Sequence, residues 1–378
     1  MFHSLELFSG AGGLAKGIER SGASHKAFVE WNPSACKTLR YNYCPDIVHE
    51  VDVRSFDFKK FTGVDLIAGG PPCQPFSLGG KAKGFNDDRD MFPYAISAIR
   101  QVVPKAFVFE NVKGLLRKSF SEYFNYILLQ LTYPDVIKKE SDWKMHLSEL
   151  EKIHTSGRYK GVKYNVVYRL VNAANYGVPQ KRERVIIVGI RSDLNVSWCF
   201  PEETHSEDSL LWDKYITQEY WEKHAISPSV GDLLSFDLEK KRLKEKYGFF
   251  SPTLRPWQTV RDVICDLPNP LEIKDYHPEH YYRGGAKSYP GHTGSDIDQP
   301  SKALKAGDHG VPGGENMIRF SDGMVRYFTI LEAKRIQTFP DDYPILGSWT
   351  EAMRQLGNAV PVKLGEVVTQ TLIHQLIS

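Results

Sequence analysis

LELFSGAGGLAKGIERSG, residues 5–22, is the stretch of sequence that decides the fold class. It begins as an apolar strand, turns at Gly10 and Gly12, and continues as a helix. Glycine lets a backbone turn tightly and lets a ligand approach it closely, and the N-terminus of the following helix offers free N–H groups. Glu30 ends the next expected strand, where an acid can hold ribose hydroxyls. The stretch therefore predicts an α/β fold that binds an adenosine-containing cofactor.

Residues 1–190 alternate short apolar runs with helical patterns. Most of the runs are nearly continuous in apolar residues, which is typical of strands covered on both faces. This alternation predicts a Rossmann-like, mostly parallel sheet with helices on both faces. The expected strands are residues 4–8, 27–31, 47–53, 64–70, 106–112, 164–171 and 184–190.

Residue composition and periodicity divide the chain into three parts. We expect a catalytic and cofactor-binding domain over residues 1–190. Residues 191–320 have little periodicity and are rich in Gly, Pro and aromatic residues, which indicates a smaller, irregular domain. Residues 321–378 regain order and include an amphipathic helix at 361–377, which we expect to return to the catalytic domain.

Composition excludes several classes of protein. The 378 residues are 41% apolar with a net charge of +2, as in ordinary globular proteins. None of the five cysteines has CxxC spacing, so no metal site and no disulfide framework are predicted. Because the sequence has no long apolar run and no signal peptide pattern, we expect a cytoplasmic protein without membrane contact.

A second stretch, GGPPCQPFS at residues 69–77, places one cysteine in a loop stiffened by prolines. The loop follows the fourth expected strand, at the sheet edge where α/β proteins bind ligands. Thiolates are strong nucleophiles near neutral pH. The pattern therefore predicts that Cys73 is a nucleophile rather than an inert, buried cysteine.

Six motifs together resemble the DNA (cytosine-5) methyltransferases of bacterial restriction-modification systems, which use S-adenosylmethionine. The motifs stand in the family's order and cover residues 1–190 and 321–378. They are FSGAGG (8–13), the PCQ loop (72–74), ENV (110–112), QKRERV (180–185), RYFTILEAKRIQTFPD (326–341) and QLGNAVPV (355–362).

The resemblance implies a chemistry for these motifs. A thiolate from Cys73 adds to carbon 6 of a cytosine, which makes carbon 5 nucleophilic toward a sulfonium methyl group. Glu110 contacts ring nitrogen 3 and the exocyclic amine, and Arg182 contacts the activated base. For Arg184, a structural ion pair is as compatible with the motif as a contact with the base.

The resemblance also implies a cofactor pocket built from residues of several motifs. Trp31 would stack on adenine, although a core aromatic residue is the alternative for this position. The full set is Phe8, Gly10 and Gly12 around the methionine moiety, Glu30 at the ribose, Trp31 and Asp52 at the adenine, and Asn358 and Val360 at the C-terminal side.

The implied substrate is a cytosine in double-stranded DNA, rotated out of the duplex and read by residues 191–320. That region holds 16 Lys and Arg against 21 Asp and Glu, so phosphate contacts must come from selected basic residues. We expect a monomer with a cognate restriction endonuclease as its genetic partner. Two alternatives remain: a tRNA cytosine-5 methyltransferase, and a nicotinamide-dependent oxidoreductase, which the glycine turn alone would also fit.

Overall fold

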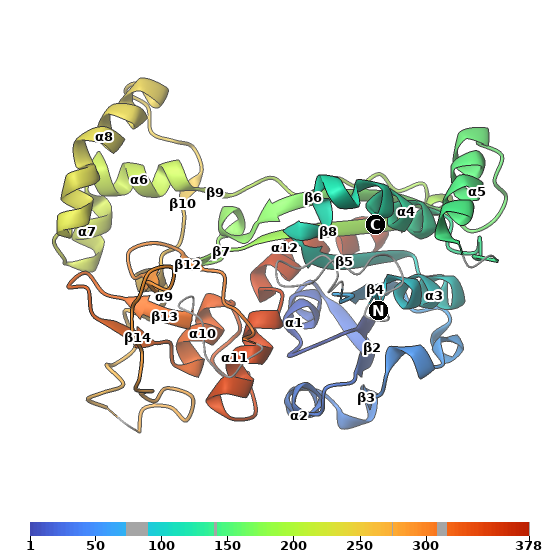
Figure 1. The fold of residues 1–378 in the computed structure, drawn as a ribbon, viewed down its shortest axis with the longest axis horizontal. Coiled ribbons are helices and arrows are strands. Elements are labelled where there is room, and N and C mark those ends of the chain that lie inside the picture. The colour runs from blue at the N-terminus through green and yellow to red at the C-terminus, as the bar shows by residue number, and fades with distance from the viewer. Residues whose placement is uncertain (73–89, 140–141, 274, 308–315, 378) are drawn as a thin grey trace. The chain divides into compact units, whose positions relative to one another are not determined.

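The computed structural model describes residues 1–72, 90–139, 142–273, 275–307 and 316–377. The chain forms two compact units (Figure 1). Unit 1 comprises Met1–Val171, Glu183–Phe200 and Gly365–Ser378, and unit 2 comprises Asn172–Arg182 and Pro201–Leu364. Among the helices of these described residues, none is long and apolar enough to cross a membrane.

A seven-stranded sheet forms the centre of unit 1, in the order β3-β2-β1-β4-β5-β8-β6. The strands from β3 to β5 run parallel, and β8 is antiparallel to β5. The predicted mostly parallel sheet is therefore confirmed. The strands are β1 (Phe2–Leu7), β2 (Ala23–Glu30), β3 (Val48–Glu50), β4 (Leu66–Gly69), β5 (Ala106–Val112), β6 (Tyr164–Asn172) and β8 (Glu183–Arg191).

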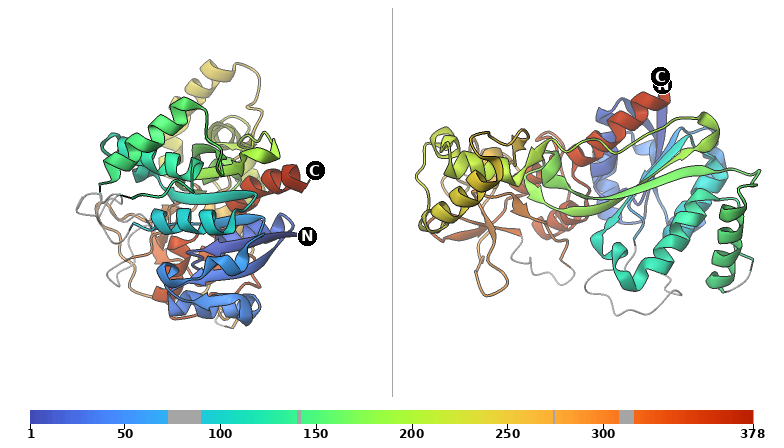
Figure 2. Two further views of the ribbon diagram at one scale, coloured as in Figure 1. Left: turned by 90° about the vertical axis from the view of Figure 1, so that its right-hand side faces the viewer. Right: turned by 90° about the horizontal axis from the view of Figure 1, so that it is seen from above.

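Helices cover both faces of this sheet (Figure 2). Because side chains of successive strand residues point to opposite faces, one strand contributes to the core on each side. In β2, Ala27 and Val29 join a core with the helices α3 (Phe92–Val102), α4 (Ser121–Thr132) and α5 (Trp143–Ser156). Phe28 points the other way.

Phe28 packs instead with the helices of the opposite face. It lies in a second cluster with Ala15 from α1 (Gly13–Arg20) and with Cys36 and Leu39 from α2 (Pro33–Asn42). The nearly continuous apolar strands of the sequence are explained by this double covering.

The last helix, α12 (Val362–Ile377), confirms the predicted helix at 361–377. From Gly365 onward it belongs to unit 1, where it packs against α1. The Ser21 hydroxyl donates to the Glu366 carbonyl at 3.2 Å and lies 2.9 Å from the Thr369 hydroxyl. A Cβ at Gly365 would lie 3.2 Å from a methyl group of Leu14, so the two helices approach closely.

Unit 2 is built from short strands and helices around small sheets, as expected for a smaller irregular domain. Its sheets pair β9 with β10, β7 with β12, and β13 with both β11 and β14. The elements are β7 (Gln180–Lys181), β9 (His205–Ser206), α6 (Glu207–Tyr215), α7 (Glu219–His224), α8 (Val230–Tyr247), β10 (Arg255–Pro256), α9 (Val260–Ile264), β11 (Ser295–Asp296), β12 (Ser301–Lys302), β13 (Met317–Arg319), β14 (Val325–Tyr327), α10 (Ile330–Ile336) and α11 (Trp349–Asn358).

The boundaries between the compact units do not lie at residues 190 and 320, where the residue pattern of the sequence placed the domain bounds. Residues 321–364 fold within unit 2 because buried polar groups tie them there. The Lys334 ammonium lies 2.5 Å from the Glu279 carboxylate, and the Leu331 amide donates to the Glu279 carbonyl at 2.9 Å. The functional division of the chain into domains stays a prediction.

The sheet contains a position where only glycine fits. Gly189 of β8 lies opposite Phe107 of β5, and a Cβ at Gly189 would lie 2.1 Å from the Phe107 ring. We expect Gly189→Ala to lower the free energy of unfolding by about 1–3 kcal/mol, since overpacking forces buried side chains to shift. Urea unfolding measures this loss. Gly284→Ala is the control, because its Cβ would meet Tyr282 at an ordinary 3.6 Å; equal midpoints for the two variants would contradict the prediction.

Candidate active site

Three parallel strands bring the predicted site residues of unit 1 to one edge of the sheet. Leu7 at the end of β1 pairs with Gly69 at the end of β4, and Gly69 pairs with Phe109 of β5. The carboxyl ends of parallel strands meet at the same edge. The glycine turn, the start of the cysteine loop and Glu110 are therefore neighbours.

The glycine turn after β1 has left-handed backbone at Phe8 (φ 52°), Gly10 (φ 52°) and Gly12 (φ 84°). Glycine adopts this conformation readily, whereas Phe8 does so at a steric cost that recurs at functional sites. Among the described residues, a Cβ at Gly10 would meet no heavy atom within 4 Å. The backbone of the turn is thus accessible to a ligand.

The Glu30 carboxylate holds this turn in place. It is buried at the end of β2 and accepts the backbone N–H of Gly10 at 2.8 Å, of Trp31 at 3.0 Å and of Asn32 at 2.8 Å. Asn32 in turn accepts the Ala35 N–H and caps α2. The acid predicted to meet a ribose therefore also fixes the glycine turn to the neighbouring strand.

The predicted adenine contacts follow β2 and β3. The Trp31 side chain is 72% exposed, which excludes the core-aromatic alternative and leaves its ring open for stacking. The Asp52 carboxylate accepts hydrogen bonds from the Arg54 guanidinium, at 2.9 Å from Nε, and these lower the pKa of Asp52. An exposed ring, two carboxylates and an open glycine turn fit an adenosine-containing ligand.

Cys73 lies outside the described residues, but the residues that flank it are fixed to β5 and α3. The Asn111 side-chain amide donates to the Pro71 carbonyl at 3.0 Å. The Met91 N–H donates to the Pro72 carbonyl at 3.2 Å. By contrast, burial raises the pKa of the Cys36 thiol to about 12, so Cys36 is unsuited to act as a nucleophile.

Glu110 lies beside the start of the cysteine loop and forms an ion pair with Arg184. Glu110 Oε1 is 2.5 Å from Arg184 Nε, and both side chains are largely buried. A Cβ at Gly70 would lie 3.2 Å from Glu110 Oε2, so the carboxylate is adjacent to the backbone just before Cys73. The antiparallel pairing of β5 with β8 brings Arg184 to this position.

Arg182 has a different environment, in unit 2. Its buried guanidinium donates to the carbonyls of Leu304 at 3.2 Å, Gly357 at 2.8 Å and Ala359 at 3.0 Å. The carbonyls of Gly357 and Ala359 flank Asn358. Asn358 is exposed, whereas Val360 is buried. Arg182 thus organises the backbone that carries the predicted C-terminal cofactor residues.

The sequence of this chain matches that of a known protein family. A model of the "C-5 cytosine-specific DNA methylase" family matches residues 2–133 and 144–374. The chain belongs to this family. It is a DNA (cytosine-5-)-methyltransferase that uses S-adenosylmethionine, and the oxidoreductase alternative is wrong.

Curated relatives of this cytosine-5 methyltransferase cover it almost completely. The Type II methyltransferase M.NgoMIV of Neisseria gonorrhoeae is 32% identical over 99% of this chain and 98% of its own. The Type II methyltransferase M.Eco47II of Escherichia coli is 33% identical over 98% of this chain and 79% of its own.

Solved structures at lower identity share the fold of the methyltransferase. A putative DNA modification methyltransferase encoded within an E. coli prophage superposes with a TM-score of 0.59 at 18% identity, over 100% of both chains. S. pombe Dnmt2 superposes with a TM-score of 0.57 at 17% identity, over 99% of both chains.

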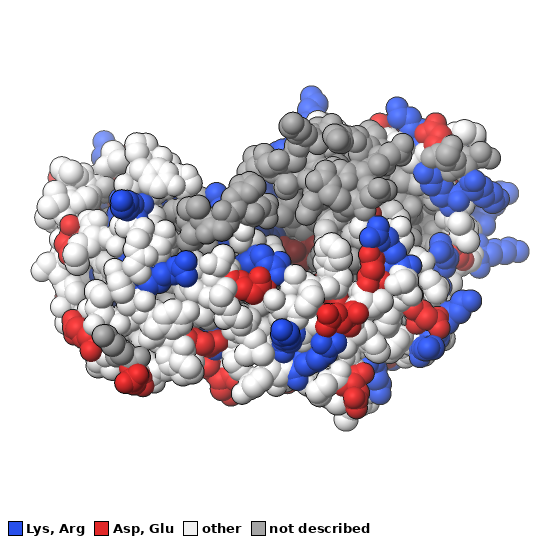
Figure 3. Space-filling model, turned by 60° about the horizontal axis from the view of Figure 1, so that its bottom comes forward, with Lys and Arg blue, Asp and Glu red and all other residues white. Residues whose placement is uncertain are grey.

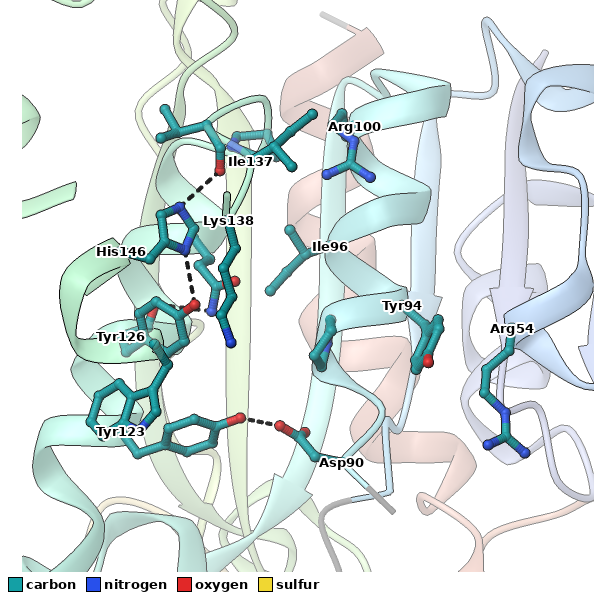
Figure 4. A pocket seen from close by; sticks show the side chains of 15 residues that line it. Arg54, Asp90, Tyr94, Ile96, Arg100, Tyr123, Tyr126, Ile137, Lys138 and His146 are labelled. Carbon is teal, nitrogen blue, oxygen red and sulfur yellow. Dashed lines mark hydrogen bonds between the residues drawn. The ribbon is translucent and has the colours of Figure 1, made fainter. Parts of the chain in front are cut away.

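One described pocket of the methyltransferase, of about 420 Å³, lies between α3, α4 and α5 and is lined by none of the predicted site residues (Figure 4). On one side, His146 bridges the Tyr126 hydroxyl at 2.8 Å and the Val136 carbonyl at 3.1 Å. Asp90, just before α3, accepts the Tyr123 hydroxyl. The pocket is therefore separate from the glycine turn.

The described residues also hold no cluster of ligands suited to a metal ion.

We expect Glu30→Gln to weaken S-adenosylmethionine binding about tenfold or more, since a charged acceptor of several N–H groups is lost and each such bond contributes about 1.5–3 kcal/mol. Calorimetric titration with the cofactor measures this change. Glu50→Gln is the matched control, because its carboxylate pairs with Arg40 at the surface. Equal affinities for the two variants would contradict the role given to Glu30.

Proposed function

We propose that this methyltransferase modifies a cytosine through a covalent adduct with Cys73. The Cys73 thiolate would form a bond to carbon 6, and the electron pair of the ring double bond would move toward carbon 5. Bound S-adenosylmethionine supplies an electrophilic methyl group. Transfer of the carbon-5 proton to water would then re-form the double bond and expel the Cys73 thiolate. The observation that carries this proposal is the Glu110–Arg184 ion pair beside Gly70, at the base of the cysteine loop.

Glu110 would contact nitrogen 3 and the exocyclic amine of the target base and would offset charge as the thiolate adds. Arg184 is the better candidate than Arg182 to assist it. The reason is geometric: Arg184 is paired with Glu110. The Arg182 guanidinium donates to Gln180 and to the backbone carbonyls of Leu304 and Gly357. Arg182 would act as a positioning residue for Asn358 and Val360.

The proposed cofactor residues are those that the family's motifs supply. Glu30, already buried and fixing the glycine turn, would face the ribose, and the exposed Trp31 would stack on adenine. The proposed set is Phe8, Gly10, Gly12, Glu30, Trp31, Asp52, Asn358 and Val360.

The proposed substrate is double-stranded DNA, with the target cytosine rotated out of the stack and sequence read by loops of unit 2. On the face drawn in Figure 3, basic and acidic side chains are interspersed, so phosphate contacts would come from individual Lys and Arg residues. The relatives M.NgoMIV and M.Eco47II are Type II methyltransferases. We propose the same role here: protection of cytoplasmic DNA against a cognate endonuclease.

Cys73→Ser is expected to reduce methyl transfer to plasmid DNA by at least about a thousandfold, because a hydroxyl is a far weaker nucleophile than a thiolate. Cofactor binding by calorimetry should persist. In the unmodified enzyme, DNA containing 5-fluorocytosine should trap a covalent complex, since fluorine cannot leave as the proton does. Substantial turnover by the serine variant would end the thiolate mechanism.

Variants of Arg182 and Arg184 are expected to differ in their kinetics. Arg184→Ala is expected to lower kcat about a hundredfold, as for loss of one preorganised electrostatic contact, to alter the pH profile of kcat, and to leave cofactor affinity unchanged. Arg184→Lys should recover part of the rate. Arg182→Ala should mainly weaken cofactor binding and lower the melting temperature. Lys113→Ala, which breaks a surface pair with Glu183, is the control; identical profiles for both arginine variants would contradict the assignment.

Side-by-side assays on duplex DNA and tRNA test the substrate. We expect labelled methyl groups in DNA only, at one sequence context that bisulfite sequencing of the plasmid would reveal. Transfer to tRNA with none to DNA would favour the tRNA alternative.

A further inference from the structure

One segment of unit 2 has no acidic side chain, although the region around it is net acidic. Residues 191–320 hold 16 Lys and Arg against 21 Asp and Glu, whereas residues 280–295 contain Arg283 and Lys287 and no Asp or Glu. We call residues 280–295 the acid-free segment. Its exposed aromatic side chains are Tyr281, Tyr282 and Tyr289. Basic and aromatic side chains without nearby acids are typical of surfaces that contact nucleic acid.

The acids that border the acid-free segment are already paired within the chain. The pairs are Glu279–Lys334, Asp296–Arg319 and Asp298–Arg261. By contrast, no carboxylate of the described residues pairs with Lys287 or with Lys302, and both lysines are exposed. The Lys302 ammonium donates to the Thr293 hydroxyl at 2.9 Å, which places its charge beside the segment. Both ammonium groups can therefore pair with an external anion.

Tyr289, Pro290, Gly291 and His292 form a tight turn within the acid-free segment. The His292 N–H donates to the Tyr289 carbonyl at 2.8 Å, and the Tyr289 N–H donates to the His292 carbonyl at 3.3 Å. Gly291 has the left-handed backbone (φ 84°) that such a turn requires after proline. Among the described residues, a Cβ at Gly291 would meet no heavy atom within 4 Å, so the tip is open.

Tyr289 stands beside this open tip with half of its surface exposed. Its ring lies 4.5 Å from the His292 ring, so it is already held in one orientation. A side chain that is held before binding loses little conformational entropy when it binds. The phenol hydroxyl can both donate and accept a hydrogen bond.

We propose that the acid-free segment binds the DNA substrate with the turn at Tyr289–His292 in the major groove. This groove admits a two-stranded β-ribbon and hence a tight turn of this kind. Lys287 and Lys302 contact phosphates, and Tyr289 contacts base edges and helps to determine which sequence is methylated. The inference rests on the proposed function and names residues of this chain that select the site.

Titration of labelled duplexes, followed by fluorescence anisotropy at several salt concentrations, tests the phosphate contacts. Lys287→Ala and Lys302→Ala are each expected to weaken binding about fivefold on every duplex and to lower the slope of log affinity against log salt by about 1. Lys241→Ala is the control, because its ammonium already lies 3.9 Å from the Glu245 carboxylate. Wild-type salt slopes in both lysine variants would overturn the phosphate contacts.

Tyr289→Ala tests the base contact. We expect this variant to bind the methylated site at least about tenfold more weakly, to lose much less affinity for unrelated duplexes, and to methylate plasmid cytosines in additional sequence contexts. Tyr289→Phe, which removes only the hydroxyl, should show the same changes in weaker form. Tyr276→Ala is the matched control, since Tyr276 is 49% exposed against 50% for Tyr289 but follows Asp275 outside the acid-free segment.

The wild-type chain distinguishes failure of this inference from failure of the proposed function. If it methylates DNA while the two alanine variants of tyrosine share its site affinity and its sequence contexts, the role of Tyr289 is wrong and the proposed function stands. An equal loss on all duplexes in Tyr289→Ala would also overturn the base contact. A wild-type chain that transfers no methyl group to DNA would overturn both. Unchanged S-adenosylmethionine affinity, measured by calorimetry, verifies that each variant is folded.

Discussion

The parallel pairing of β1, β4 and β5 is the constraint on which the site in unit 1 depends. Hydrogen-bonded register places Leu7, Gly69 and Phe109 side by side, so that whatever follows each residue meets the others at one edge. The glycine turn follows the first strand, the cysteine loop the second, and Glu110 belongs to the third. The glycine turn, the backbone at Gly70 and Glu110 thus converge although they are distant in sequence.

Hydrogen bonds and an ion pair then fix the groups that the sheet has brought together. The Glu30 carboxylate holds the turn at Gly10, and the Asn111 amide holds the carbonyl of Pro71. Arg184 lies against Glu110 because β8 runs antiparallel to β5. Each contact links neighbouring strands, so the geometry of the site rests on buried polar bonds as well as on the apolar core.

Arg182 and Arg184 show how two residues of one motif acquire separate tasks. The chain passes from unit 2 to unit 1 between Arg182 and Glu183. One guanidinium therefore binds the carbonyls that flank Asn358, and the other pairs with Glu110.

The sequence by itself determined the alternating α/β pattern, the nature of the glycine turn and the family, because apolar periodicity and motif order are local properties of the chain. It also supplied Glu30, at the end of β2, and Glu110, within β5. Only the tertiary structure decided that residues 321–364 fold with unit 2, that Arg184 pairs with Glu110, and that Trp31 is exposed. These facts depend on contacts between segments far apart in sequence, which spacing along the chain does not encode.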